Sequence, residues 1–203
     1  MIFMQIKQIG DNFSYVIADE KTREAAVVDP SFNAEEITRV LKEKKLKLLY
    51  IFATHGHVDH TAGNSQLRSE FGARIIAQES SKISKDISVK DGDQVKVGNM
   101  VIGVLHTPGH TPDGVCLLVD GKLLTGDTLF VGECGRTDLP GGNAEDLYHS
   151  LFDKLGKLND SVEVYPGHDY GPKPHSTIGE QKRTNYVLEK RSLEEFTEFM
   201  GQQ

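Results

Sequence analysis

Apolar residues recur along the chain with two different periods, which predict alternating strands and helices. Alternating apolar and polar positions between turn sequences such as Asp120-Gly121 indicate strands and hairpins. Strands are predicted at 1–9, 13–19, 24–29, 48–53 and 74–78, as a run of hairpins over 91–119, and at 122–124 and 162–165.

Helices are predicted where apolar residues lie three or four positions apart. One such pattern follows Asn33, a residue that can cap a helix. Leu147, Leu151 and Leu155 predict a second helix over 144–158. Further helices are predicted at 64–71, 179–190 and 193–200, and residues 80–87 are predicted to be irregular or helical. The mixture of elements predicts an α/β protein with one domain, 1–203, that includes a short C-terminal helical segment at about 179–203.

Composition narrows the classes of function. Of the 203 residues, 37% are hydrophobic, which is enough for a globular core, and the formal net charge is −7. An acidic chain is not expected to bind nucleic acid or a membrane surface. The sequence has no membrane-spanning apolar run and no recognisable secretory signal, so we expect a cytoplasmic protein. Two cysteines cannot form a disulfide framework, which agrees with a reducing compartment.

The stretch 51–64 contains the strongest chemical signal. A buried strand ends there, and four side chains that can bind metals follow within six positions: His55, His57, Asp59 and His60. Imidazole and carboxylate ligands without a thiolate cluster suit zinc, iron or manganese. The chain has eight histidines, so three within six positions are not expected by chance. This loop is therefore predicted to hold metal.

Three more residues of the same chemical types occupy similar settings later in the chain. His110, Asp127 and His168 each follow a hydrophobic run and are directly preceded by glycine. Each alone has a simpler explanation as a turn residue that bonds to its own backbone. Together with the first four they supply enough donors for two metal ions about 3.5–4 Å apart.

With Thr54-His-Gly-His-Val-Asp-His60 followed by His110, Asp127 and His168, the chain resembles the metallo-β-lactamase-fold hydrolases. This resemblance implies an αββα sandwich, in which two mixed β-sheets pack face to face with helices on the outer faces. It also implies two divalent metal ions, zinc first, with iron or manganese as alternatives. The implied ligands are His55, His57 and His110 at one site, Asp59, His60 and His168 at the other, and a bridging Asp127.

The segments Cys134-Gly-Arg-Thr-Asp138 and His168-Asp-Tyr170 are similar to those of the glyoxalase II group. That group hydrolyses thioesters of glutathione and 2-hydroxy acids. The same segments resemble the related persulfide dioxygenases, which use a single iron in the first site. The resemblance places Arg136 and Tyr170 against the substrate. One departure is Tyr186, which follows Asn185 where relatives often have proline.

Three functional hypotheses follow. The leading one is a hydroxyacylglutathione hydrolase-like thioesterase, in which metal-bound hydroxide attacks the acyl carbon and Asp59 is the catalytic carboxylate. The alternative is a mononuclear iron persulfide dioxygenase that uses His55, His110 and Asp127. The third is a non-catalytic metal-binding domain. The expected partner is a small thioester or thiol-derived molecule, and the oligomeric state cannot be inferred from the sequence.

Overall fold

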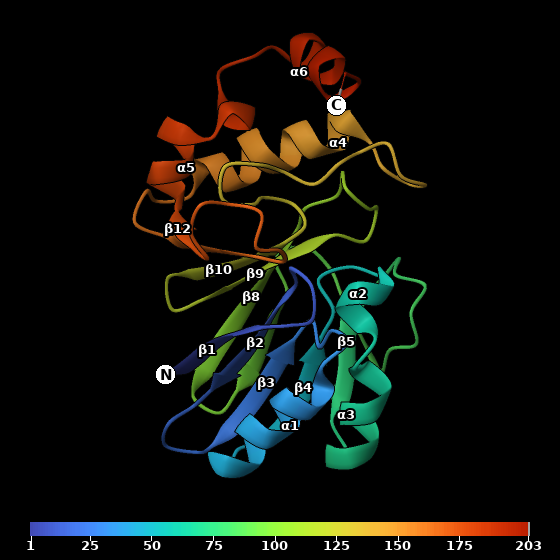
Figure 1. Ribbon diagram of the computed structural model, residues 1–203, viewed down its shortest axis with the longest axis vertical. Helices are drawn as coiled ribbons and strands as arrows, with labels where there is room; N and C mark the ends of the chain where they lie inside the picture. The colour runs from blue at the N-terminus through green and yellow to red at the C-terminus, as the bar shows by residue number, and fades with distance from the viewer. Residues whose placement is uncertain (203) are drawn as a thin grey trace.

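Two six-stranded sheets form the centre of the protein in the computed structural model, which describes residues 1–202 (Figure 1). The first sheet contains, in spatial order, β1 (Ile2–Lys7), β2 (Phe13–Ala18), β3 (Glu24–Val28), β4 (Lys47–Phe52), β5 (Arg74–Gln78) and β6 (Ile87–Val89). The second contains β12 (Ser176–Thr177), β11 (Glu163–Pro166), β10 (Lys122–Gly126), β9 (Val115–Val119), β8 (Met100–His106) and β7 (Gln94–Val97). Both sheets are mixed: β3 to β6 pair in parallel in the first, as do β10 and β11 in the second.

Helices cover the outer face of each sheet, as Figure 1 shows. The first sheet carries α1 (Ala34–Glu43) and α3 (Asn64–Phe71), with the short α2 (Val58–Thr61) between β4 and α3. Over the second lie α4 (Ala144–Tyr148), α5 (Ile178–Thr184), α6 (Leu193–Met200), a π-helical turn (His149–Lys154), and 3-10 turns at Leu155–Lys157 and Tyr186–Leu188. The predicted αββα sandwich is confirmed. None of the helices within residues 1–202 is long and apolar enough to cross a membrane.

The alternation of side chains along the strands creates three apolar layers. In β2, Phe13, Tyr15 and Ile17 point between the two sheets, whereas Val16 and Ala18 point outward. The outward residues pack under the helices of the first sheet, and an equivalent layer lies between the second sheet and α4 to α6. Residues two apart share one face of a strand, so β2 supplies side chains both to the layer between the sheets and to the layer under the helices.

Local departures from the predicted elements have physical causes. The loop 55–63 contains the helical turn α2, which is too short to show an apolar period. Strand β6 begins at Ile87, the last residue of the segment 80–87 that was predicted to be irregular or helical, and it forms by pairing with β5. Asn33 precedes α1 as predicted, yet its side chain makes no capping bond, and its backbone N–H donates to Gln8 Oε1 at 3.0 Å.

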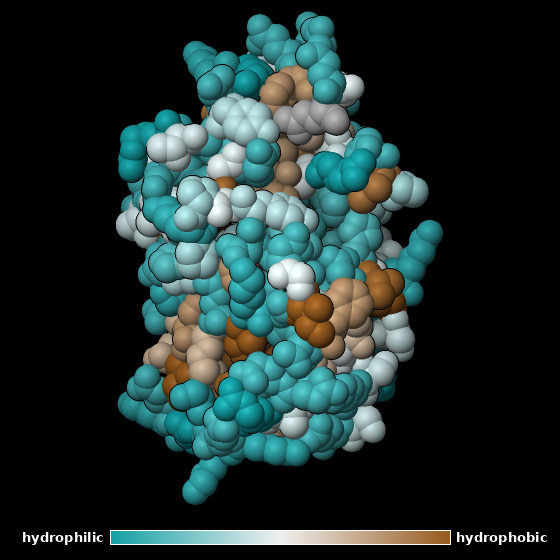
Figure 2. Space-filling model, viewed as in Figure 1, coloured by the Kyte–Doolittle hydropathy of each residue, from teal (hydrophilic) through white to brown (hydrophobic). Residues whose placement is uncertain are grey.

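The surface seen in Figure 2 is mostly hydrophilic, with hydrophobic side chains gathered in the lower half, over the first sheet and around α2. Val58, the first residue of α2, is one of the exposed large hydrophobic residues, together with Ile9 and Phe32. Asp59 follows Val58 directly, so this apolar surface borders the predicted metal ligands.

Candidate metal centre

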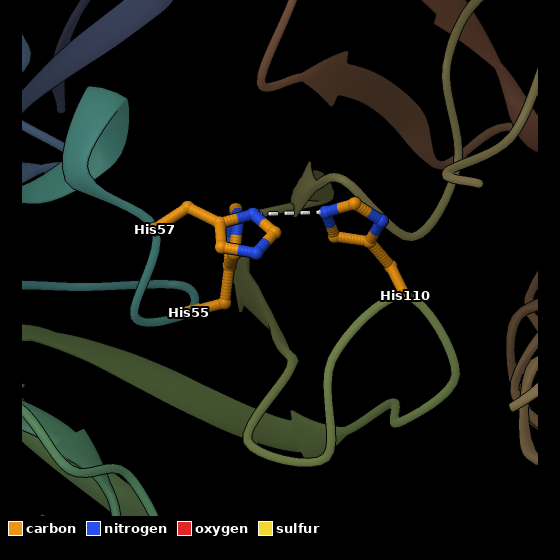
Figure 3. Close-up of side chains that lie close together, drawn as sticks. All are labelled: His55, His57 and His110. Atoms are coloured by element: carbon orange, nitrogen blue, oxygen red, sulfur yellow. Dashed lines mark hydrogen bonds between the residues drawn. The ribbon is translucent and has the colours of Figure 1, made fainter. Parts of the chain in front are cut away.

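The loops that follow β4, β8, β10 and β11 converge at one edge of the two sheets. They bring together all seven residues predicted to bind metal: His55, His57, Asp59, His60, His110, Asp127 and His168. Figure 3 shows His55 and His57, which leave one loop, facing His110 from another. Parallel strands end at the same edge, so residues distant in sequence meet here.

Three histidines form the first group. His57 Nδ1 lies 3.0 Å from His55 Nε2 and 3.1 Å from His110 Nε2. Asp127 Oδ2 lies 3.9 Å from His55 Nε2 and 3.6 Å from His110 Nε2. These nitrogens and the carboxylate oxygen therefore surround one point.

The second group lies on the other side of Asp127. His60 Nε2 and His168 Nε2 are 3.1 Å apart, and Asp59 Oδ2 is 3.4 Å from each of them. Asp127 reaches this group as well, because its Oδ1 lies 3.3 Å from His60 Nε2 and its Oδ2 lies 3.3 Å from His168 Nε2. Asp127 thus stands between the two groups, where the resemblance places a bridge.

The outer nitrogens of three histidines show why the cluster suits a cation. His110 Nδ1 donates to the carbonyl of Arg136 at 2.8 Å, because a carbonyl can only accept. His60 Nδ1 lies 2.9 Å from Asp29 Oδ2, and His168 Nδ1 lies 3.0 Å from Asp11 Oδ1. With the proton on Nδ1, the Nε2 atoms of His60 and His168 face one another as lone pairs. Two lone pairs cannot form a hydrogen bond with each other, so a proton or a metal ion must lie between the two nitrogens.

Burial and neighbouring charges shift the pKa values of the residues in the cluster. Burial lowers the pKa of His55, which is 2% exposed. Burial also lowers the pKa of His168, but hydrogen bonds with Asp127 and Asp59 outweigh it and raise the pKa to about 10. His168 and His60 hold the pKa of Asp59 well below its usual range. Asp127 Oδ1 is buried and has no hydrogen-bond partner among the described residues. The donor set and this free oxygen fit divalent metal ions.

Two glycines let the backbone approach the cluster closely. A methyl group on Gly167 would overlap Asp127 Oδ1 and come within 2.8 Å of His60 Cε1. A methyl group on Gly135 would overlap the carbonyl oxygen of Asp127. Glycine at these positions is therefore required by space, not only by backbone freedom.

A cleft of about 520 Å³ opens onto the cluster. It is lined by His57, Asp59, His110, Asp127, Phe130, Glu133, Cys134, Gly135, Arg136, Leu139, His168 and Tyr170. Tyr170 stacks on His168 with ring centroids 4.8 Å apart, and Arg136 pairs with Asp138 at 2.5 Å. Burial raises the pKa of the Cys134 thiol to about 12, and its sulfur packs against Met200, so the thiol form is favoured over the nucleophilic thiolate.

Sequence reasoning missed several residues at this site. Asp29 and Asp11 have no recognisable signal, because their role depends on folding next to His60 and His168. Phe130 lies edge-on to His168 and Tyr170, with centroid distances of 5.8 and 5.0 Å. Glu133 also lines the cleft. Phe130 and Glu133 lie between Asp127 and Arg136, and the sequence analysis gave neither of them a role.

The chain is similar to known proteins over nearly its whole length. The model of the metallo-beta-lactamase superfamily matches residues 9–81 and 77–168. The mitochondrial persulfide dioxygenase ETHE1 of Homo sapiens is 34% identical over 99% of this chain and 80% of its own length. The crystal structure of ETHE1 from Myxococcus xanthus superposes with a TM-score of 0.95 at 38% identity, covering 99% of this chain and 90% of that one. A protein of Schizosaccharomyces pombe that is named probable hydroxyacylglutathione hydrolase glo2 is 36% identical over 81% of this chain and 66% of its own length.

These relatives correct one prediction. Thioester hydrolysis was the leading hypothesis, and it is wrong as the main interpretation, because relatives that match 93% to 99% of the chain are named persulfide dioxygenases. The predicted resemblance to the glyoxalase II group and the persulfide dioxygenases is confirmed. By its matched family model, its sandwich of two mixed sheets and its cluster of histidines and aspartates, the chain is an enzyme that belongs to the metallo-beta-lactamase superfamily.

Proposed function

We propose that this chain is a persulfide dioxygenase that uses one iron held by His55, His110 and Asp127. The observation that carries the proposal is the similarity to ETHE1 proteins, which extends over 99% of the chain in both sequence and structure. Two histidines and one carboxylate with open positions are the ligand set of non-haem iron oxygenases. The distances of Asp127 Oδ2 from His55 Nε2 and His110 Nε2, 3.9 and 3.6 Å, are compatible with a shared ion.

Iron in this set would supply open positions where dioxygen and a sulfur ligand meet. The proposed reaction adds both oxygen atoms to the outer sulfur of a persulfide, RSSH, and water then breaks the sulfur–sulfur bond. One RSSH, one O2 and one H2O give one RSH and one H2SO3, so atoms and electrons balance. The sulfur is oxidised and dioxygen is reduced.

The residues of the chain would orient the substrate and control its protons. Arg136 lines the cleft and can bind a carboxylate of the thiol, since its guanidinium is exposed and its partner Asp138 is also exposed. The aromatic ring of Tyr170 stacks on His168 and would contact the substrate from that side of the cleft. Asp59 stays the proposed catalytic residue: it faces the cleft, and because its carboxylate is held in the charged form it can accept a hydrogen bond from the S–H group of an incoming persulfide. The substrate is a small molecule, because the cleft holds only about 520 Å³.

The second group of ligands does not decide between oxygenation and hydrolysis. Asp59, His60 and His168 are all in place and close together. In a mononuclear centre, a proton shared among these groups can hold them beside Asp127, whose Oδ1 lies 3.3 Å from His60 Nε2. Their presence therefore agrees with either reaction.

The proposal is tested by replacing Asp127. Iron-loaded wild-type protein should consume oxygen when glutathione persulfide is added. Asp127→Ala removes one of three proposed ligands, so iron affinity and oxygen uptake should fall by at least about 100-fold. Asp153→Ala is the matched control, because Asp153 is exposed and pairs with His149 and Lys157, which are also exposed. Iron-loaded wild-type protein that takes up no oxygen with any persulfide would overturn the proposal.

A further inference from the structure

The cleft carries opposite charges on one wall. Glu133 and Arg136, three positions apart in the same loop, both line it. The guanidinium of Arg136 is paired with Asp138, but both side chains are more than half exposed, so a substrate carboxylate can exchange with Asp138 at little cost. Glu133 is partly exposed at this lining, and its carboxylate accepts a hydrogen bond from the Tyr186 hydroxyl at 2.5 Å.

Residues of the C-terminal segment contact Glu133 and fix its position. Asn185, which is 2% exposed, donates through Nδ2 to the carbonyls of Glu133 and Phe130 at 3.1 and 3.4 Å. The ring of Tyr186 lies edge-on to Phe199, with centroids 5.8 Å apart. The backbone and the carboxylate of Glu133 are thus fixed by two successive residues, and a fixed group binds a ligand at a lower entropic cost.

We infer that Glu133, positioned by Tyr186, is a specificity-determining residue that binds the ammonium group of the substrate. A carboxylate only accepts hydrogen bonds, an ammonium group has three to donate, and such charged pairs are stronger than neutral ones. With Arg136 for a carboxylate, the cleft selects persulfides of zwitterionic thiols, meaning amino-acid or short-peptide thiols with a free amine. This inference rests on the proposed function, because it concerns the entrance to the same metal cluster.

Two substrates that differ only in the amine test it. Glutathione persulfide has a free ammonium group, and N-acetylglutathione persulfide does not. The iron-loaded wild-type enzyme should prefer the first by about tenfold in kcat/KM, the effect expected of one charged hydrogen bond. Glu133→Gln keeps the shape and removes the charge, so the preference should fall to about one, mainly through a higher KM for glutathione persulfide. Tyr186→Phe should lose part of the preference.

Glu145→Gln is the matched control, because Glu145 is exposed in α4 and does not line the cleft. This variant should keep both the activity and the tenfold preference of wild type. A Glu133→Gln enzyme that retains the preference, or one that slows both substrates equally, would overturn the inference.

A binding measurement separates this inference from the proposed function. Calorimetric titration of the iron-loaded protein with glutathione and N-acetylglutathione should show about tenfold tighter binding of the first to wild type, and equal binding to Glu133→Gln. Equal binding of both thiols to wild type would overturn the ammonium site even if persulfides are oxidised. Absence of oxygen uptake would overturn the dioxygenase alone, and the titration would still decide the role of Glu133.

Discussion

At the scale of single residues, the metal centre depends on groups that contact no metal. Asp29 and the carbonyl of Arg136 each hold the outer nitrogen of a histidine, and this leaves the inner nitrogen as a lone pair. Asp29 also accepts from the backbone N–H and the hydroxyl of Thr54 at 2.7 and 2.6 Å. One buried carboxylate therefore positions His60 and ties β3 to the loop after β4.

Replacing Gly167 with alanine tests how tightly the cluster is packed. The added methyl group would overlap Asp127 Oδ1, so the carboxylate must move or the backbone must shift. We expect a loss of about 1–3 kcal/mol in the free energy of unfolding and a lower iron content. Gly103→Ala in β8 is the control, because its methyl group would meet only the Leu118 carbonyl at 3.7 Å. Metal analysis and urea unfolding measure both effects, and equal behaviour of the two variants would contradict the packing argument.

The stability of the metal-free protein should depend on the charge of His168. Burial lowers the pKa of His168, but Asp127 and Asp59 raise it to about 10 in the folded protein. The unfolded value is about 6.5, so the stabilising contribution is complete below about pH 6.5 and is lost as the pH rises to about 10. Urea unfolding over this range should show falling stability for wild type and a weaker dependence for His168→Gln. Identical pH profiles of the two proteins would refute this.

At the scale of elements, strands and helices with a clear period were predictable, and long-range attachments were not. The bounds of β5, α3 and α6 follow from local apolar spacing, and the structure confirms them. The positions of His110, Asp127 and His168 at turns after apolar runs were also visible, because strand ends are marked by glycine. The hydrogen bonds from Asn185 to the turn 130–133 could not be predicted, since those residues are more than fifty positions apart and carry no shared pattern.

Asn185→Ala should loosen the wall of the cleft. The variant loses the four hydrogen bonds of the Asn185 side chain, including those to the carbonyls of Phe130 and Glu133, at a cost of about 1–3 kcal/mol. Amide hydrogen exchange in residues 130–135 should speed up by about tenfold or more, since 1.4 kcal/mol corresponds to tenfold. Asn159→Ala, which removes two local turn bonds donated by Ser161, should not change exchange there. Unchanged exchange in Asn185→Ala would show that the turn 130–133 is stable without Asn185.

At the scale of the whole molecule, the two halves of the chain share one centre. The first half supplies His55, His57, Asp59 and His60, and the second supplies His110, Asp127 and His168. The sequence predicted this set and the sandwich, because ligand type and strand ends are local properties. It left the reaction open between hydrolysis and dioxygenation, since the ligand set His55, His57, Asp59, His60, His110, Asp127 and His168 agrees with either. The similarity to ETHE1 proteins over 99% of the chain favours the dioxygenase.

The most direct test of the central claim supplies the iron-loaded protein with glutathione persulfide and, separately, with S-lactoylglutathione. Oxygen consumption and sulfite are measured with the first, and free thiol with the second. A persulfide dioxygenase should consume oxygen and form sulfite in equal amounts, and should leave the thioester intact. Cleavage of the thioester without any oxygen uptake on the persulfide would contradict the account.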